Sequence, residues 1–285
     1  MDSALVVIYG LILCWGAAWG SFLNVVIWRL PNEMSVVSPP SHCPKCQRNL
    51  AWWHNVPVFG WAWLGGKCHY CKVAISARYP AVEATTAALT LAVSIPWVSA
   101  WLIGDLMPWQ AGVGLLAEHL LIFACVAIAL IDADTFMIPD RLSLPLVPLG
   151  IVVAVLIGEH RGVSWQEASL ASFVAGGGLL AVQWGYAAMT GREGLGTGDV
   201  KLLAALGAWL GLQTLPPLLL LASVQGLLFA FGTSFFGKTN LKEERGLESL
   251  RHLALPFGPF LVLAGLQTLL LRSYLEPLIR TWLGG

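Results

Sequence analysis

The chain has 285 residues, of which 57% are hydrophobic and 11% are charged, and its formal net charge is zero. Soluble globular proteins carry roughly 25% charged residues, so this composition excludes an ordinary soluble domain and predicts an all-α polytopic membrane protein. The basic residues are spread over separate loops instead of forming one patch, which argues against a nucleic-acid partner.

Eight apolar stretches are predicted to span the membrane, because a spanning helix needs roughly 20 mostly apolar residues. The first stretch, 5–28, is longer than the apolar core of a signal peptide and lacks a small-residue cleavage site, so we expect it to be retained. Two of the other seven are short for a full span. These seven are 82–103, 111–131, 142–157, 168–189, 200–213, 215–236 and 254–273.

The sixteen Lys and Arg residues are distributed unevenly over the loops of this eight-helix arrangement. Thirteen fall on one side of the membrane, and only Arg161, Arg272 and Arg280 fall on the other. The positive-inside rule makes the first side cytoplasmic and places both termini outside. Omitting one short helix would move the basic residues between Lys238 and Arg251 to the wrong side, so the charge distribution supports the helix count.

The one long polar segment, 31–79, is predicted to be a small zinc-binding cytoplasmic domain inserted after the first helix. It contains two C-x-x-C pairs separated by 21 residues, which predict a tetrahedral four-thiolate Zn²⁺ site. Such a closed site has no open coordination position, so a structural role is expected. Nearby histidines are alternative ligands, but four cysteines already satisfy the metal. The predicted ligands are Cys43, Cys46, Cys68 and Cys71.

Two acidic residues lie at the cytoplasmic ends of predicted helices. Asp132 ends the third helix, where a carboxylate is costly unless it faces water or a polar cavity. Asp199 follows a glycine-rich loop and is expected at the N-cap of a later helix, where the helix dipole favours an anion. An aspartic protease needs two neighbouring carboxylates, which share a proton and activate a water molecule, and two acids at one membrane face could meet this requirement. Taken singly, each acid is equally well explained by a helix cap or a solvated loop.

Five segments resemble, in order, the signature segments of the bacterial type IV prepilin peptidases, which are GxGD aspartic proteases. The resemblance covers essentially the whole chain. The segments are GSFLNVVIWRLP (20–31), the paired cysteine knuckles, ISARYPAVE (75–83), IDADTFMIPDRLSLP (131–145) and GTGDVKLLAALGAWLG (196–211).

The resemblance implies a bifunctional enzyme of the bacterial inner membrane. Such an enzyme cleaves the leader of type IV prepilins and type II secretion pseudopilins at the cytoplasmic face, then methylates the new N-terminal amine using S-adenosylmethionine. Its substrate brings a basic leader and an apolar helix into contact with membrane lipid. No methyl-donor pocket is evident in the sequence. The implied division is a first membrane helix (1–30), a zinc-binding domain associated with methylation (31–79) and a membrane peptidase domain (80–285).

Carried over residue by residue, the resemblance makes Asp132 and Asp199 the catalytic acids. Asp134 is a close competitor of Asp132, and Asp140 is expected to shape its loop.

Two other classes of function fit some of these features. One is a proton-coupled transporter in which Asp132 and Asp199 carry protons, and the other is a zinc-dependent assembly factor without catalysis. Against the transporter, both acids lie at one membrane face, and the sequence shows no internal duplication of the kind from which many transporters are built.

Overall fold

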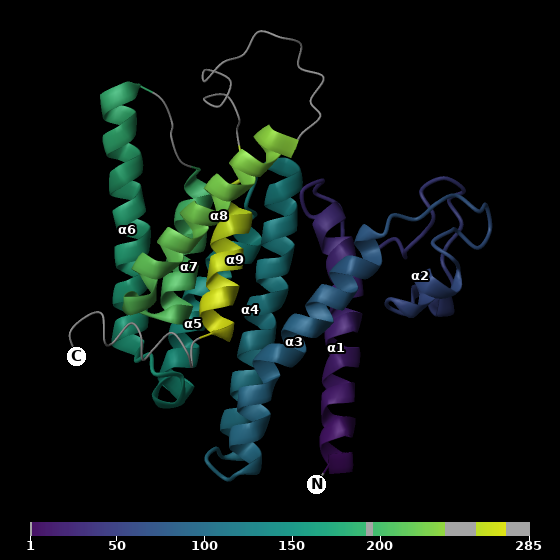
Figure 1. The fold of residues 1–285 in the computed structure, drawn as a ribbon, viewed down its shortest axis with the longest axis horizontal. Coiled ribbons are helices and arrows are strands. Elements are labelled where there is room, and N and C mark those ends of the chain that lie inside the picture. The colour runs from purple at the N-terminus through teal and green to yellow at the C-terminus, as the bar shows by residue number, and fades with distance from the viewer. Residues whose placement is uncertain (1, 192–195, 237–254, 272–285) are drawn as a thin grey trace. The chain divides into compact units, whose positions relative to one another are not determined.

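The computed structural model describes residues 2–191, 196–236 and 255–271 (Figure 1). These residues form helices and connecting loops and contain no β-strand. The helices are α1 (Asp2–Arg29), η1 (Trp52–Asn55), α2 (Phe59–Trp63), α3 (Arg78–Leu102), α4 (Pro108–Thr135), α5 (Asp140–Arg161), α6 (Trp165–Thr190), α7 (Thr197–Leu210), η2 (Leu212–Thr214), α8 (Leu215–Phe236) and α9 (Gly258–Leu270).

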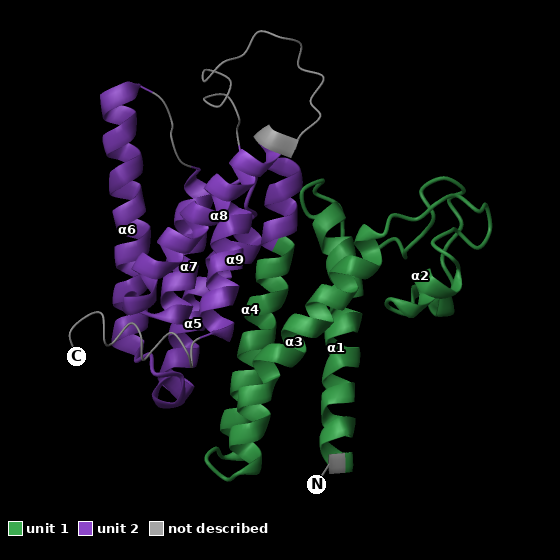
Figure 2. Ribbon diagram, in the orientation of Figure 1, with its two compact units in different colours: residues 1–127 green, residues 128–285 purple. Residues whose placement is uncertain are grey.

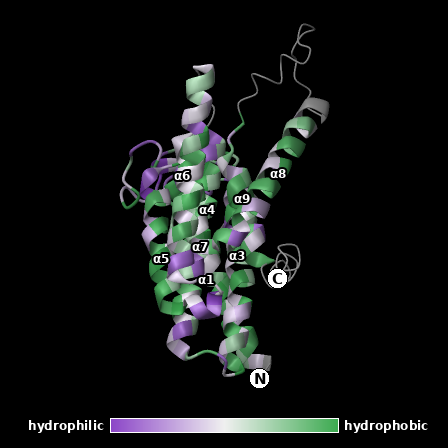
Figure 3. Ribbon diagram, turned by 90° about the vertical axis from the view of Figure 1, so that its left-hand side faces the viewer, coloured by the Kyte–Doolittle hydropathy of each residue, from purple (hydrophilic) through white to green (hydrophobic). Residues whose placement is uncertain are grey.

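Each of the eight predicted membrane helices corresponds to one observed helix, so the all-α polytopic class is confirmed. Among the described residues, six helices have the length and composition of a membrane span, and hydrophobic residues run along α5 most clearly (Figure 3). The other two, α7 and α9, have 14 and 13 residues and fall short of the roughly 20 that a span needs. The last predicted stretch, 254–273, extends at both ends beyond the described residues.

The chain divides into two compact units, residues 1–127 and 128–285, and helix α4 runs from the first into the second (Figure 2). The first unit holds α1 to α3 and the segment with the cysteine pairs. The second holds the last turns of α4 and helices α5 to α9.

Within the first unit, α1 packs closely against α3 because α1 presents glycines at the contact. A Cβ on Gly16 would lie 2.8 Å from Cα of Ala87, and one on Gly20 would lie 2.7 Å from Cα of Glu83. Small residues allow helices to approach in this way where lipid offers no hydrophobic driving force. The polar segment 31–79 therefore leaves and re-enters the membrane region at the adjoining ends of these two helices.

Within the second unit, α7 is the central helix, and α5, α6 and α9 pack around it (Figure 1). Almost every residue from Val200 to Leu210 is buried. The indole N–H of Trp209 donates to the carbonyl of Leu146 at 2.7 Å, so the one polar group of this buried ring is satisfied. Because α7 is buried and packed against three other helices, its N-terminal end, which carries Asp199, is held in place.

Candidate active site

Asp132 lies in the last turns of α4, and its side chain is buried. Its Oδ2 accepts a hydrogen bond of 3.0 Å from the backbone N–H of Gly258, the first residue of α9. The chain leaves α4 through Phe136, whose φ of 56° is left-handed and whose N–H donates to the Asp132 carbonyl at 2.8 Å. The end of α4 and the start of α9 are thus joined at the Asp132 carboxylate.

Asp199 is the third residue of α7 and is partly buried. The expectation that Asp199 would be the N-cap is wrong, because the helix begins at Thr197 and Gly196 is the N-cap. The Asp199 carboxylate instead reaches back to accept a hydrogen bond from the backbone N–H of Gly196. An acid at this position still benefits from the free N–H groups and the dipole of the first turn.

Ile138 packs between the start of α7, which carries Asp199, and the start of α9, which binds Asp132. A Cβ on Gly198 would lie 2.9 Å from Cβ of Ile138, and a Cβ on Gly258 would lie 3.0 Å from its Cδ1. Gly198 is therefore needed for the start of α7 to approach this side chain, whereas a Cβ on Gly258 would press only against its flexible end. Gly198 directly precedes Asp199, and Gly258 binds the Asp132 carboxylate, so Ile138 links the surroundings of the two acids.

The two neighbouring acids differ from this pair. Asp134 lies two residues beyond Asp132 and is exposed, whereas Asp132 is buried. Asp140 begins α5, and both of its carboxylate oxygens accept from Nζ of Lys201, at 2.7 and 2.8 Å. Because Lys201 is two residues beyond Asp199, this ion pair ties the start of α5 to the start of α7.

Sequence reasoning missed Gly258 and Ile138. The Gly258-Pro259 pair is a helix-start signal, since proline favours the first turn, and it would have placed the start of α9 better than the predicted residue 254. No local pattern shows that this start lies against Asp132, because the contact spans 126 positions.

The four predicted metal ligands come together in the first unit. The sulfur atoms of Cys43, Cys46, Cys68 and Cys71 all lie within 4.8 Å of one another, and Sγ of Cys43 is 3.8 Å from Sγ of Cys71. A tetrahedral Zn²⁺ with Zn–S bonds of ~2.3 Å places its sulfurs ~3.8 Å apart. Hydrogen bonds, the strongest from the backbone of Cys46, lower the pKa of the Cys43 thiol to about 6, which favours the thiolate that a metal needs. The cluster therefore fits a soft divalent cation.

The two cysteine pairs adopt the same backbone turn. The N–H of Gln47 donates to the carbonyl of Cys43 at 2.8 Å, and the N–H of Lys72 donates to the carbonyl of Cys68 at 3.0 Å. Gln47 and Lys72 both have left-handed backbones, with φ of 55° and 58°. Each C-x-x-C turn brings its two sulfur atoms together, and the two turns together form the four-sulfur cluster.

Comparison with known proteins decides the family. The chain is 38% identical over 291 residues to the prepilin leader peptidase/N-methyltransferase of Pseudomonas aeruginosa, covering 92% of this chain and 91% of that protein. It is 34% identical to the protein of that name from Aeromonas salmonicida, covering 92% and 90%. The chain belongs to the type IV leader peptidase family. Residues 14–97 match the Bacterial Peptidase A24 N-terminal domain, and residues 119–231 match the Type IV leader peptidase family.

Membership of the type IV leader peptidase family confirms the resemblance found in the sequence motifs. With its six apolar spans, it also makes the chain a multi-pass inner-membrane protein. No solved structure matches the chain.

One further contact in this leader peptidase ties the zinc-binding segment to α3. The buried carboxylate of Glu83 accepts a 2.6 Å hydrogen bond from the backbone N–H of Val58, which precedes α2. Val58 has a φ of 63°, a conformation that a β-branched residue rarely adopts. The Glu83 carboxylate therefore holds a strained turn of the segment against the membrane helix.

Proposed function

We propose that this protein cleaves the leader peptide from type IV prepilins or type II secretion pseudopilins, with Asp132 and Asp199 as the catalytic acids. The observation that carries the proposal is that the start of α7, which holds Asp199, and the start of α9, which binds buried Asp132, both lie against Ile138. Membership of the type IV leader peptidase family supports it. The burial of Asp132 and the exposure of Asp134 favour Asp132 as the first acid.

The chemistry follows from two carboxylates that share one proton. The ionised carboxylate takes a proton from a water molecule while the water oxygen attacks the scissile carbonyl carbon. The protonated carboxyl donates to the carbonyl oxygen as it becomes tetrahedral. When the C–N bond breaks, the acid that took the water's proton gives it to the leaving amine, and a hydroxyl of the tetrahedral intermediate returns a proton to the other carboxylate, which restores the pair. Because two coupled carboxyl groups titrate together, the shared proton is not assigned to one of the two residues.

The glycine-rich approach to Asp199 suits an extended peptide substrate. Gly196 carries no side chain that would obstruct a backbone approaching Asp199, since a Cβ there would lie 3.3 Å from Oδ2 of this acid.

We place the active site at the cytoplasmic face, and the thirteen-to-three distribution of basic residues supports this side for the C-terminal end of α4 and the start of α7. The substrate's basic leader then lies in the cytoplasm, its apolar helix lies in membrane lipid, and the scissile bond lies at the membrane surface.

We further propose that the same chain methylates the new N-terminal amine, as the printed names of its relatives indicate for those proteins. Bound S-adenosylmethionine supplies the methyl group. Residues 31–79 form the domain associated with this step, and residues 80–285 form the peptidase domain. Cys43, Cys46, Cys68 and Cys71 hold a structural Zn²⁺. Neither the transporter nor the assembly factor gains support from the relatives.

The deciding experiment incubates the purified, membrane-reconstituted protein with a prepilin and reads the product by mass spectrometry. We expect loss of the leader and, with S-adenosylmethionine present, addition of one methyl group. The control is the Asp199→Asn variant, which should leave the prepilin intact. Leader cleavage that persists in this variant would count against an aspartic protease.

A further inference from the structure

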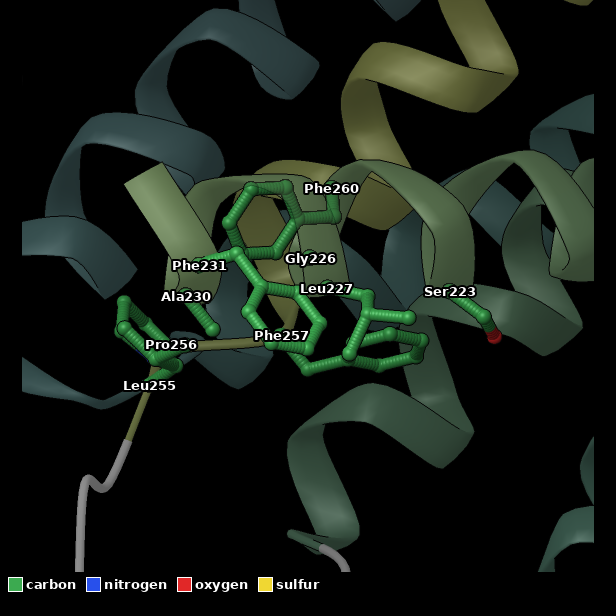
Figure 4. A pocket seen from close by; sticks show the side chains of 9 residues that line it. All are labelled: Ser223, Gly226, Leu227, Ala230, Phe231, Leu255, Pro256, Phe257 and Phe260. Carbon is green, nitrogen blue, oxygen red and sulfur yellow. The ribbon is translucent and has the colours of Figure 1, made fainter. Parts of the chain in front are cut away.

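An apolar pocket lies between α8 and α9 in the second unit, with a volume of about 430 Å³ (Figure 4). Three aromatic side chains line it, Phe231 from α8, Phe257 just before α9 and Phe260 from its first turn. Small residues of α8, Gly226 and Ala230, leave the space open. Among its lining residues only a serine carries a polar side chain, and none is charged.

This pocket adjoins the Asp132 carboxylate through a single peptide unit. Phe257 lines the pocket, and the N–H of the next residue, Gly258, donates to Oδ2 of Asp132 at 3.0 Å. The residue that lines the pocket and the residue that binds the acid are thus consecutive at the start of α9. An apolar cavity with a few convergent polar groups beside it is the usual form of a ligand site.

We propose that this pocket is a subsite for an apolar side chain of the substrate, in the first turn of the segment that follows the scissile bond. The inference rests on the proposed function, because it takes Asp132 as a catalytic acid. The apolar lining indicates whether a residue before or after the scissile bond occupies the pocket. A Lys or Arg of the leader would lose its water in this pocket without gaining a partner, which is costly. An apolar residue of the following helix has no such cost and packs against the phenylalanine side chains that line the pocket.

The first test locates the occupant without requiring catalysis. A prepilin carrying a benzophenone side chain at each of the first four residues after the scissile bond is irradiated with the Asp199→Asn variant in nanodiscs. We expect one of these positions to crosslink to α8 residues between Gly226 and Phe231, or to Phe260 of α9. Crosslinks that map only outside these segments, or to lipid, would overturn the subsite.

The second test fills the pocket at the position that crosslinks. A Cβ on Gly226 would sit 3.5 Å from Cδ2 of Phe260, an ordinary contact, so a larger side chain at this position extends into the cavity. The matched control is Gly232→Leu on the same helix, where a Cβ would meet nothing within 4 Å. Both variants are assayed with two prepilins, one with Phe and one with Ala at the crosslinking position.

We expect Gly226→Leu to lower kcat/KM for the Phe substrate by roughly 10- to 200-fold, the range over which apolar pockets discriminate, and to spare the Ala substrate. Gly232→Leu should leave the ratio of the two substrates unchanged. Equal loss with both substrates would mean that the pocket shapes the helices or holds an acyl chain, and no loss would mean that it is not used; either overturns the proposal. Failure of the proposed function itself would be recognised separately, since the wild-type protein would then cleave neither substrate.

Discussion

The backbone N–H of Gly258 donates to Oδ2 of Asp132 at 3.0 Å, although 126 positions separate the two residues. A Cβ on Gly258 would lie 2.6 Å from the same oxygen, closer than any real contact allows. The first residue of α9 thus both binds the carboxylate and leaves it room. Any side chain at this position must push the carboxylate away from the donor that orients it.

We predict that Gly258→Ala lowers kcat for leader cleavage by roughly 10- to 150-fold, because a lost hydrogen bond to a charged group is worth about 1.5–3 kcal/mol. The variant should still fold, since the added methyl group meets one side-chain oxygen and the end of the Ile138 side chain. Steady-state kinetics together with thermal unfolding would measure both quantities. Gly232→Ala is the control, with open space around its Cβ. Normal kcat in folded Gly258→Ala would refute the positioning role.

A second prediction concerns the acid pair. Asp132→Asn and Asp199→Asn should each abolish leader cleavage while the protein stays folded, because an amide of the same shape cannot exchange the proton that the mechanism requires. Asp134→Asn is the matched control, an exposed acid two residues beyond Asp132. Cleavage by each variant is read from leader loss. If Asp134→Asn is inactive and Asp132→Asn is active, the first acid lies two residues further along.

The helices could be predicted from the sequence because their signal is local. Long apolar stretches bounded by charged residues and prolines predicted the eight long helices of the described residues but not the short α2, and their ends differ from the observed ones by a few residues. The prediction of Asp199 as an N-cap failed by three positions, since it took the first apolar residue, Val200, as the start of the helix. The helix begins at Thr197, where the backbone already turns before the apolar residues start.

The candidate site could be predicted only in part, for a related reason. The two acids and four cysteines occur in short motifs, so their chemistry is readable from spacing. The residues that orient them are not, because Gly258 reaches Asp132 from another helix and Glu83 reaches Val58 across 25 positions. Such contacts arise from packing between distant segments. The sequence around Gly258 or Glu83 does not indicate which residue each one contacts.

The ion pair between Asp140 and Lys201 supports a third prediction. Its side chains are 54% and 33% exposed, and exposed pairs contribute about 0.2–1 kcal/mol. Asp140→Asn should therefore lower the free energy of unfolding by no more than about 1 kcal/mol and should leave leader cleavage within a few-fold of normal. Chemical unfolding in detergent and the prepilin assay would measure the two effects. Complete loss of cleavage in a folded Asp140→Asn protein would instead place this carboxylate in the chemistry.

The fourth prediction concerns Glu83, whose carboxylate holds the Val58 turn at 2.6 Å. Glu83→Ala should release the strained turn and loosen the zinc-binding segment from α3. We expect methylation to fall further than leader cleavage, because Asp132 and Asp199 lie in the other unit. Hydrogen exchange of residues 56–63 should increase in parallel. Unchanged exchange in this segment would show that the Glu83 contact does not restrain it.

The last prediction tests the cysteine cluster by metal removal. Purified protein should contain one Zn²⁺ per chain, bound by the four sulfurs that lie within 4.8 Å of one another, and elemental analysis would detect it. The site is closed, so the metal holds the segment together and takes no part in peptide hydrolysis. Chelation, or Cys43→Ser, should therefore reduce methylation more than leader cleavage, with both read from one prepilin sample by mass spectrometry. Cys125→Ser is the matched control, because this buried thiol lies in α4, outside the cluster. Equal loss of the two activities in protein that remains folded, or protein that carries no metal, would contradict this division of labour.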